Sequence, residues 1–187
     1  MRIFAPTETD PSERRVPLVP ASVTKLAALG AQVEVEAGLG RTVYFSDAEY
    51  EAAGAKIVAD LPQALASADI VLRLRKPPIA AIAALKRGCI HISFLDPFTD
   101  VETVRALAAA GASAICMEMI PRSTIAQKMD ALSSQASLAG YVAVLLGENR
   151  LDSIFPMMMT PAGTITSGRT KIEALHLVGV QGRAILI

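Results

Sequence analysis

The residues best suited to ligand chemistry lie between positions 121 and 134, where a guanidinium, an amide, a carboxylate and a hydroxyl occur close together. These groups belong to Arg122, Gln127, Asp130 and Ser133. They offer hydrogen-bond donors and acceptors to a small group that carries both, such as a carboxamide. The alternative is structural: Arg122 pairs with Asp130, and Asp130 caps a following helix whose serines face solvent. Residue types and spacing leave both interpretations open.

A second polar cluster, Glu13–Pro20, follows the first predicted strand. Loops at the end of a strand often carry function, and the guanidinium of Arg15 is able to clamp a planar anionic or amide group. The alternative is a charged loop that is simply solvated. The sequence alone does not decide between these two interpretations.

Other chemistries find few suitable residues, since the chain has two histidines and two cysteines. His91 has an isoleucine on either side within a predicted strand, so we expect it to pack in the core. Cys89 and Cys116 lie in apolar runs, which is typical of buried free thiols in a reducing compartment. We expect no metal site, because no group of ligands has the required spacing, and the sequence has no P-loop.

These residues must be positioned by strands and helices, which alternate along the chain. Ser46 with Glu49 and Thr99 with Glu102 form predicted capping boxes, and glycines follow several of the predicted helices. Parallel strands need a crossover that packs on the sheet, so the alternation predicts a doubly wound α/β domain with a mostly parallel sheet and helices on both faces. The predicted strands are Met1–Ala5, Gln32–Ala37, Lys56–Val58, Ile70–Leu74, Cys89–Phe94 and Ser113–Met117.

A long helix is predicted after this domain, because Asp130–Leu146 contains no proline and has apolar residues at helical spacing. The residues beyond this helix contain several prolines and glycines and indicate an extended linker. We therefore expect a Rossmann-like N-terminal domain over residues 1–128. The linker helix and the start of an incomplete second domain then occupy residues 129–187.

Composition argues against two classes of partner. Equal numbers of basic and acidic residues, 18 of each, leave no surplus positive charge for a nucleic-acid surface. Apolar runs such as Tyr141–Leu146 are far too short to span a bilayer, and the first residues show no signal-peptide pattern. We expect a cytoplasmic chain without a transmembrane segment.

Four segments of the sequence resemble one family. They are similar to the N-terminal part of the α subunit of proton-translocating NAD(P) transhydrogenase, whose fold alanine dehydrogenase shares, and the resemblance runs from Met1 to about Ile165. It implies that Arg122, Gln127, Asp130 and Ser133 hold the nicotinamide end of NAD(H), with Gln127 and Asp130 in the catalytic roles. The segments that carry the resemblance are Glu13–Pro17, Gly30–Gly38, Met129–Tyr141 and Thr160–Ile165.

The resemblance also implies an activity and partners. It implies hydride transfer from NADH to NADP⁺ of the Si-specific, proton-translocating type, with NADP bound by a partner subunit and protons moved by membrane-embedded partners. A homodimer in the cytoplasm, peripheral on the inner face of the cell membrane, is the expected assembly. The alternatives are an alanine-dehydrogenase-like oxidoreductase and a truncated, non-catalytic α/β module.

One difference bears on the choice between the two enzymes. The alanine dehydrogenases that this sequence resembles use a histidine in a Phe-Leu-His segment to move a proton. This chain has Asp96 after Phe94 and Leu95. Hydride exchange between two nicotinamides needs no acid or base at the reacting carbon, only rings held in line. The sequence therefore favours the transhydrogenase reaction.

A second difference concerns the end of the sequence. After Ile165 the family continues into a Rossmann strand and a glycine-rich turn, but here Gly179–Gly182 falls short of the dinucleotide fingerprint because Leu177 occupies the first glycine position. We therefore expect residues 129–187 to hold only the truncated start of an NAD-binding domain, with weak autonomous binding of NAD.

Overall fold

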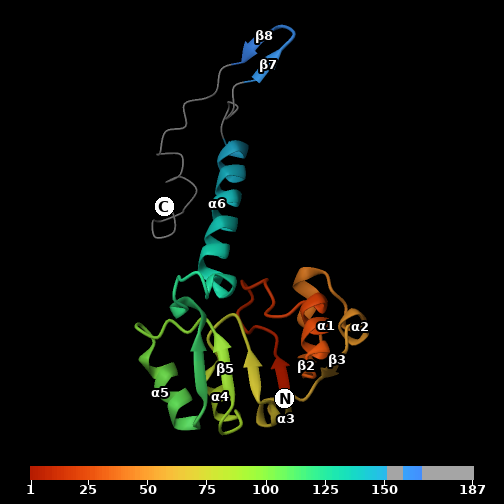
Figure 1. Ribbon diagram of the computed structural model, residues 1–187, viewed down its shortest axis with the longest axis vertical. Helices are drawn as coiled ribbons and strands as arrows, with labels where there is room; N and C mark the ends of the chain where they lie inside the picture. The colour runs from red at the N-terminus through yellow and green to blue at the C-terminus, as the bar shows by residue number, and fades with distance from the viewer. Residues whose placement is uncertain (151–157, 166–187) are drawn as a thin grey trace. The chain divides into compact units, whose positions relative to one another are not determined.

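The computed structural model describes residues 1–150 and 158–165 (Figure 1). The chain divides into two compact units, Met1–Arg122 and Ser123–Ile187. The division predicted from the sequence, between residues 128 and 129, stays a prediction. The prediction for residues 166–187 lies outside the described residues.

The first unit is built on a parallel sheet of six strands in the order β3-β2-β1-β4-β5-β6. The strand order reverses between β1 and β4, which lie side by side at the centre of the sheet. The predicted doubly wound α/β fold with a mostly parallel sheet is confirmed. The strands are β1 (Arg2–Ala5), β2 (Gln32–Glu36), β3 (Ala55–Val58), β4 (Ile70–Leu72), β5 (Ile90–Ser93) and β6 (Ser113–Cys116).

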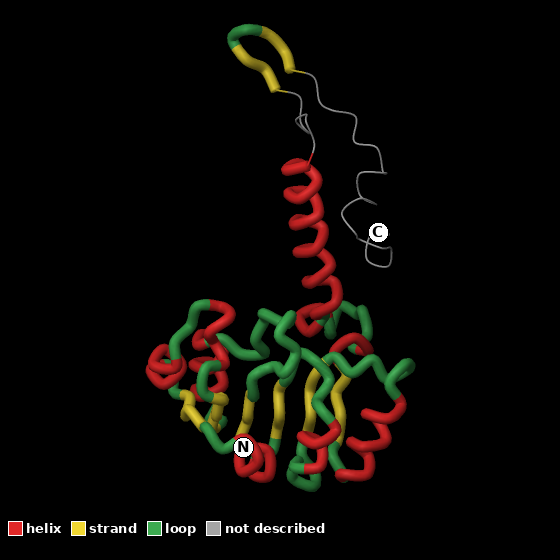
Figure 2. Tube along the Cα trace, turned by 180° about the vertical axis from the view of Figure 1, so that it is seen from behind, coloured by secondary structure: helices red, strands yellow, loops and turns green. Residues whose placement is uncertain are grey.

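Helices cover both faces of this sheet (Figure 2). Neighbouring residues of a strand point to opposite faces, so Ile3 and Phe4 of β1 enter two different cores. Ile3 packs with residues of α1 and α2, whereas Phe4 packs with residues of α3, α4 and α5. The helices are α1 (Pro20–Ala28), α2 (Asp47–Ala52), α3 (Leu61–Ser67), α4 (Ile79–Ala83) and α5 (Val101–Ala110), with short 3₁₀ turns η1 (Leu39–Val43) and η2 (Met117–Met119).

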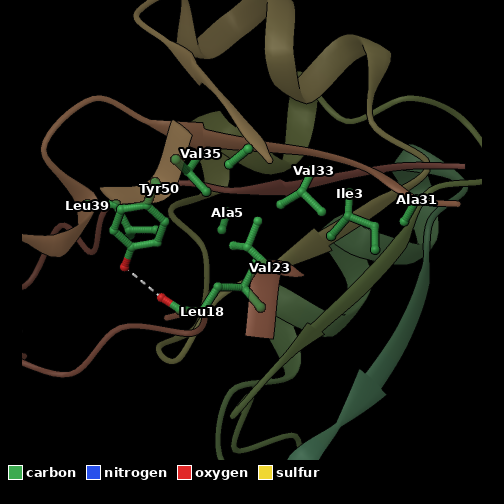
Figure 3. Packing of buried hydrophobic residues seen from close by; sticks show 10 residues of the cluster. Ile3, Ala5, Leu18, Val23, Ala31, Val33, Val35, Leu39 and Tyr50 are labelled. Atoms are coloured by element: carbon green, nitrogen blue, oxygen red, sulfur yellow. Dashed lines mark hydrogen bonds between the residues drawn. The ribbon is translucent and has the colours of Figure 1, made fainter. Parts of the chain in front are cut away.

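Tyr50 anchors the first of the two cores (Figure 3). Its ring is fully buried, and its hydroxyl donates to the carbonyl of Leu18 at 2.8 Å. Burial of a large side chain such as this contributes roughly 1.5–3 kcal/mol, and the hydrogen bond prevents an unsatisfied hydroxyl in the core. This bond ties the loop before α1 to α2.

The two predicted capping boxes have different outcomes. Ser46 and Glu49 form the predicted reciprocal box at the start of α2. The box of Thr99 and Glu102 is wrong, because Asp100 is the N-cap of α5 and accepts a hydrogen bond from the backbone N–H of Thr103 at 3.0 Å. A charged carboxylate beside the helix start is a stronger acceptor than the neighbouring hydroxyl.

The second unit begins with the 3₁₀ turn η3 (Gln127–Met129) and continues into α6 (Ala131–Arg150). The predicted long helix is therefore present. Where the sequence indicated an extended linker, β7 (Met158–Thr160) and β8 (Gly163–Ile165) form an antiparallel hairpin instead. Within the described residues, no helix has the length and apolar character that a membrane crossing needs.

Candidate functional site

The carboxyl ends of β1 and β4 form the natural ligand-binding edge of the first unit. In a doubly wound sheet, a crevice opens where the strand order reverses, and ligands bind beyond the carboxyl ends of the strands there. The loop after β1, residues 6–19, and the loop after β4, residues 73–78, leave the sheet at this point. The polar cluster that the sequence placed after the first strand lies in the first of these loops.

Two carboxylates attach the β1 loop to the neighbouring strands. Glu36, at the end of β2, accepts hydrogen bonds from the backbone N–H and the hydroxyl of Thr7 at 2.7 and 2.8 Å. On the other side, Glu8 accepts a hydrogen bond from the backbone N–H of Leu74 at 2.6 Å and lies 3.8 Å from the guanidinium of Arg73. The loop is therefore fixed to both strands that flank β1.

Further along the same loop, Glu13 binds two guanidinium groups. Its side chain is 3% exposed and accepts from Nε and Nη2 of Arg15 at 2.7 and 2.6 Å, and from Nε of Arg75 at 3.0 Å. The hydrogen bond from Arg15 is the main cause that lowers the pKa of Glu13 to about 2, although burial opposes it. The guanidinium of Arg15 is thus held in place, while its side chain stays 46% exposed.

Beyond the end of β5, carboxylates again bind groups from other segments of the chain. The backbone N–H groups of Leu95 and Asp96 both donate to Oε1 of Glu118, and Asp96 has a left-handed backbone with φ of 50°. Lys76 pairs with Asp100, which lowers the pKa of that carboxyl to about 2, helped by hydrogen bonds from Thr103. Most of the ion pairs at this edge therefore join different loops.

His91 packs in the core, as the sequence predicted. It is fully buried, and its Nε2 lies 3.0 Å from the hydroxyl of Ser93. Burial, assisted by the positive charge of Arg73, lowers the pKa of His91 to about 4, so the imidazole is neutral at physiological pH. Cys89 is a buried free thiol as predicted, and Cys116 is free but half-buried.

The predicted nicotinamide-binding residues lie where the first unit ends and the second begins along the sequence. Arg122 ends the first unit and is exposed, while Gln127 begins η3 and is also exposed. Asp130 accepts from the backbone N–H and the hydroxyl of Ser133 at 2.9 and 2.6 Å, and its carbonyl accepts from the hydroxyl of Ser134. Asp130 therefore caps α6, as the structural alternative proposed, and the ligand-binding role of the four residues stays a prediction.

A separate groove of about 450 Å³ lies beside β2, β3 and α3. Glu34 is nearly buried there, with Arg2 at 3.8 Å and Lys56 at 3.9 Å. The charges lining this groove compensate one another, and the groove lies away from the carboxyl ends of β1 and β4. We therefore place the candidate site at the strand ends rather than in this groove. Among the described residues, no group of histidine, cysteine and acidic side chains is arranged to hold a metal ion.

The strand order, the helices on both faces and the polar edge at the reversal point define a Rossmann-like α/β domain of the nucleotide-binding type. Residues 4–139 match the family model described as alanine dehydrogenase/PNT, N-terminal domain. The chain belongs to this family, and the resemblance found in the sequence is confirmed.

Individual relatives agree with this assignment. An NAD(P) transhydrogenase alpha subunit protein of Rhodospirillum rubrum is 39% identical over 189 residues, which cover 98% of this chain and 49% of that protein. The alanine dehydrogenase of Mycobacterium tuberculosis is 32% identical over 151 residues, covering 81% of this chain and 40% of that protein. A transhydrogenase crystal structure from Sinorhizobium meliloti superimposes with a TM-score of 0.81 at 42% identity, over 89% of this chain and 50% of that one. The chain thus spans about half the length of these relatives.

Proposed function

We propose that this chain forms the N-terminal part of the NAD(H)-binding subunit of an NAD(P) transhydrogenase. In this role it helps to transfer a hydride from NADH to NADP⁺. The relatives that match almost the whole chain carry the transhydrogenase name, and the fold is of the nucleotide-binding type. NADP is bound by a partner subunit, and membrane-embedded partners couple the reaction to proton translocation.

The proposed site is the stretch from Arg122 to Ser133. Arg122 and Gln127 donate hydrogen bonds to the nicotinamide carboxamide, and Asp130 and Ser133 orient that end of the cofactor at the start of α6. Arg122 and Gln127 are exposed, which supports their contact with a ligand. These residues act by aligning the nicotinamide ring, since two rings in contact exchange a hydride without a proton donor.

One observation carries the choice of reaction. An alanine dehydrogenase moves a proton as well as a hydride, and His91, the histidine within the described residues, is buried and bonded to Ser93. Asp96 stands where the resembling dehydrogenases have a histidine. The similarity to alanine dehydrogenase keeps that enzyme as the second candidate.

The proposed assembly is a homodimer on the cytoplasmic side of the membrane, docked to the NADP-binding and membrane-embedded subunits. This arrangement brings the two nicotinamides together while the chain itself stays outside the bilayer. The alternative of a non-catalytic module predicts the same fold without nucleotide turnover.

A chimeric subunit tests the proposal. Residues 1–165 of this chain are joined to the second half of a transhydrogenase relative, and the purified subunit is combined with its NADP-binding partner. We expect NADH to reduce an NADP⁺ analogue, and we expect no NAD⁺ reduction with L-alanine. Alanine-dependent reduction would establish the dehydrogenase instead, and no turnover with either pair would leave the non-catalytic module.

Two arginine variants locate the site within that chimera. Arg122→Gln should weaken NADH binding, because it removes the guanidinium of the proposed carboxamide site. Arg87→Gln is the matched control, since Arg87 is also exposed but follows α4 at the opposite edge of the sheet. Equal NADH affinities in the two variants would exclude Arg122 from the site.

A further inference from the structure

A belt of polar side chains crosses the first unit at the carboxyl ends of its central strands. It leads from Glu36 in β2 to Thr7 and Glu8 in the loop after β1, and from there to Arg73 after β4. The partners along this belt are 29 and 66 residues apart in the sequence. The belt therefore links segments that only the folded sheet brings together.

Arg73 is the cation at the centre of this belt. Its side chain is 1% exposed, its Nη1 donates to the carbonyl of Thr7 at 3.3 Å, and the same nitrogen lies 3.8 Å from Oε2 of Glu8. The backbone N–H of Arg73 bonds the carbonyl of Ile92 at 3.0 Å, so the residue is itself fixed to β5. A buried guanidinium with a planar fork restrains the groups around it more tightly than a flexible ammonium does.

Stability alone does not explain this buried charge. Within the described residues, two buried atoms of the belt, Oε2 of Glu8 and Nε of Arg73, have no hydrogen-bond partner. Unsatisfied buried polar atoms oppose folding, and an apolar side chain of similar size is often neutral or better at such a position. An apolar side chain cannot form the polar contacts with Thr7 and Glu8 that fix the conformation of the β1 loop.

We propose that Arg73 is a positioning residue, which holds the β1 loop so that Arg15 is presented in a fixed orientation at the ligand-binding edge. Arg73 contacts this loop at Thr7 and Glu8. Glu13 and Arg15, which bind each other, follow in the same loop. The chain direction of β4 then carries Arg75 to Glu13. Arg73 thus positions both guanidinium groups that bind Glu13, that of Arg15 in the β1 loop and that of Arg75 after β4.

The proposal does not depend on the nature of the ligand or on the transhydrogenase reaction. It concerns the order of the β1 loop in the free protein. The Nε–H of Arg15 reports this order directly, because it donates to Oε1 of Glu13 at 2.7 Å in the held conformation. Its exchange with water is measurable by nitrogen-15 NMR on the 187-residue chain.

Arg73→Met is the principal test. We expect the Arg15 Nε–H to exchange at least about tenfold faster, which is about 1.4 kcal/mol of lost protection, while the amides of β2 keep their rates. Leu107→Ala is the matched control, because Leu107 is buried in the core around Phe4 and not in the belt. The control should lower the unfolding temperature without changing the exchange of Arg15. An unchanged Arg15 signal in folded Arg73→Met would overturn the proposal.

Arg73→Lys keeps the test decisive if the methionine variant does not fold. The lysine retains the charge but loses the fork, so we expect exchange at Arg15 to rise severalfold while the unfolding temperature changes little. Glu8→Gln retains an acceptor for the Leu74 amide and should give a smaller increase. Wild-type exchange in Arg73→Lys would show that charge alone suffices and would refute positioning by the guanidinium.

Discussion

The loop after β1 and the loop after β6 both carry arginine, carboxylate and hydroxyl groups, yet they use them differently. In the first, Glu8 and Glu13 are nearly buried and bind other segments of the chain. In the second, Arg122 and Gln127 are exposed, and the carboxylate of Asp130 accepts hydrogen bonds from Ser133, three residues away. The comparison distinguishes a loop that builds a rigid edge from a loop whose polar groups remain accessible to a ligand.

The accessible loop should not bind a nucleotide tightly without the rest of the subunit. A polypeptide of residues 1–187 spans about half the length of its relatives. We expect it to show no saturable binding of NADH at micromolar concentrations, because the pyrophosphate and ribose contacts carry most of the affinity of dinucleotide sites. NADH fluorescence titration measures this. Saturation at micromolar concentrations would mean that residues 1–187 already contain those contacts.

Gln127→Ala tests the same loop in a complete subunit. Turnover should fall on the order of a hundredfold while NADH affinity changes little, because a ring displaced by about 1 Å loses its alignment but few of its contacts. Gln63→Ala in α3 is the matched control, since Gln63 is exposed and remote from this loop in the sequence. Steady-state kinetics separate kcat from KM. Wild-type turnover in Gln127→Ala would mean that this loop has only a structural role.

Acid tests the rigid loop. The pKa of Glu13 lies at about 2 against an ordinary value of 4.5, so the unfolded chain takes up a proton before the folded one does. The stability contributed by Glu13 is complete above about pH 4.5 and is lost as the pH falls towards 2. We expect it to be about 1–2 kcal/mol, because water screens the exposed part of Arg15. Urea unfolding at several pH values measures it, and Glu13→Gln should flatten the pH dependence in that window.

The smallest expected effect concerns the start of α6. Asp130→Ala removes the acceptor for the Ser133 N–H and should reduce helix stability by about 1 kcal/mol, whereas Asp130→Asn retains an acceptor and should cost less. Circular dichroism of both variants during thermal unfolding measures the difference. A large loss in Asp130→Asn would mean that the negative charge of Asp130, and not only its capping bond, is required.

Local signals in the sequence predicted much of the fold. The strands were predictable because they are short runs, either mainly apolar or alternating between polar and apolar residues, and most are bordered by a glycine or a proline. Ser46 with Glu49 is a capping box whose parts lie three residues apart. The box at Thr99 was mispredicted because Asp100, next to it, is the better acceptor. The hairpin of β7 and β8 was missed because a methionine run followed by Pro161 does not alternate like a strand.

The site was predictable only where its parts are neighbours in sequence. Asp130 and Ser133 are three residues apart and meet at the start of α6, so the capping alternative was already visible. Arg73 and Thr7 are 66 residues apart in the sequence, and neither residue type indicates that the other is its hydrogen-bond partner. Contacts of this kind depend on the strand order, which periodicity does not determine.

The central position of β1 has a consequence for how the protein folds. β1 pairs with β2, about 30 residues away, but also with β4, where Phe4 meets Val71. The half containing β1, β2 and β3 can therefore form from nearby segments, whereas the second half must close a much longer loop before any of its contacts with β1 exist. During synthesis β2 and β3 are therefore made before β4, and one side of β1 stays unpaired until β4 is added.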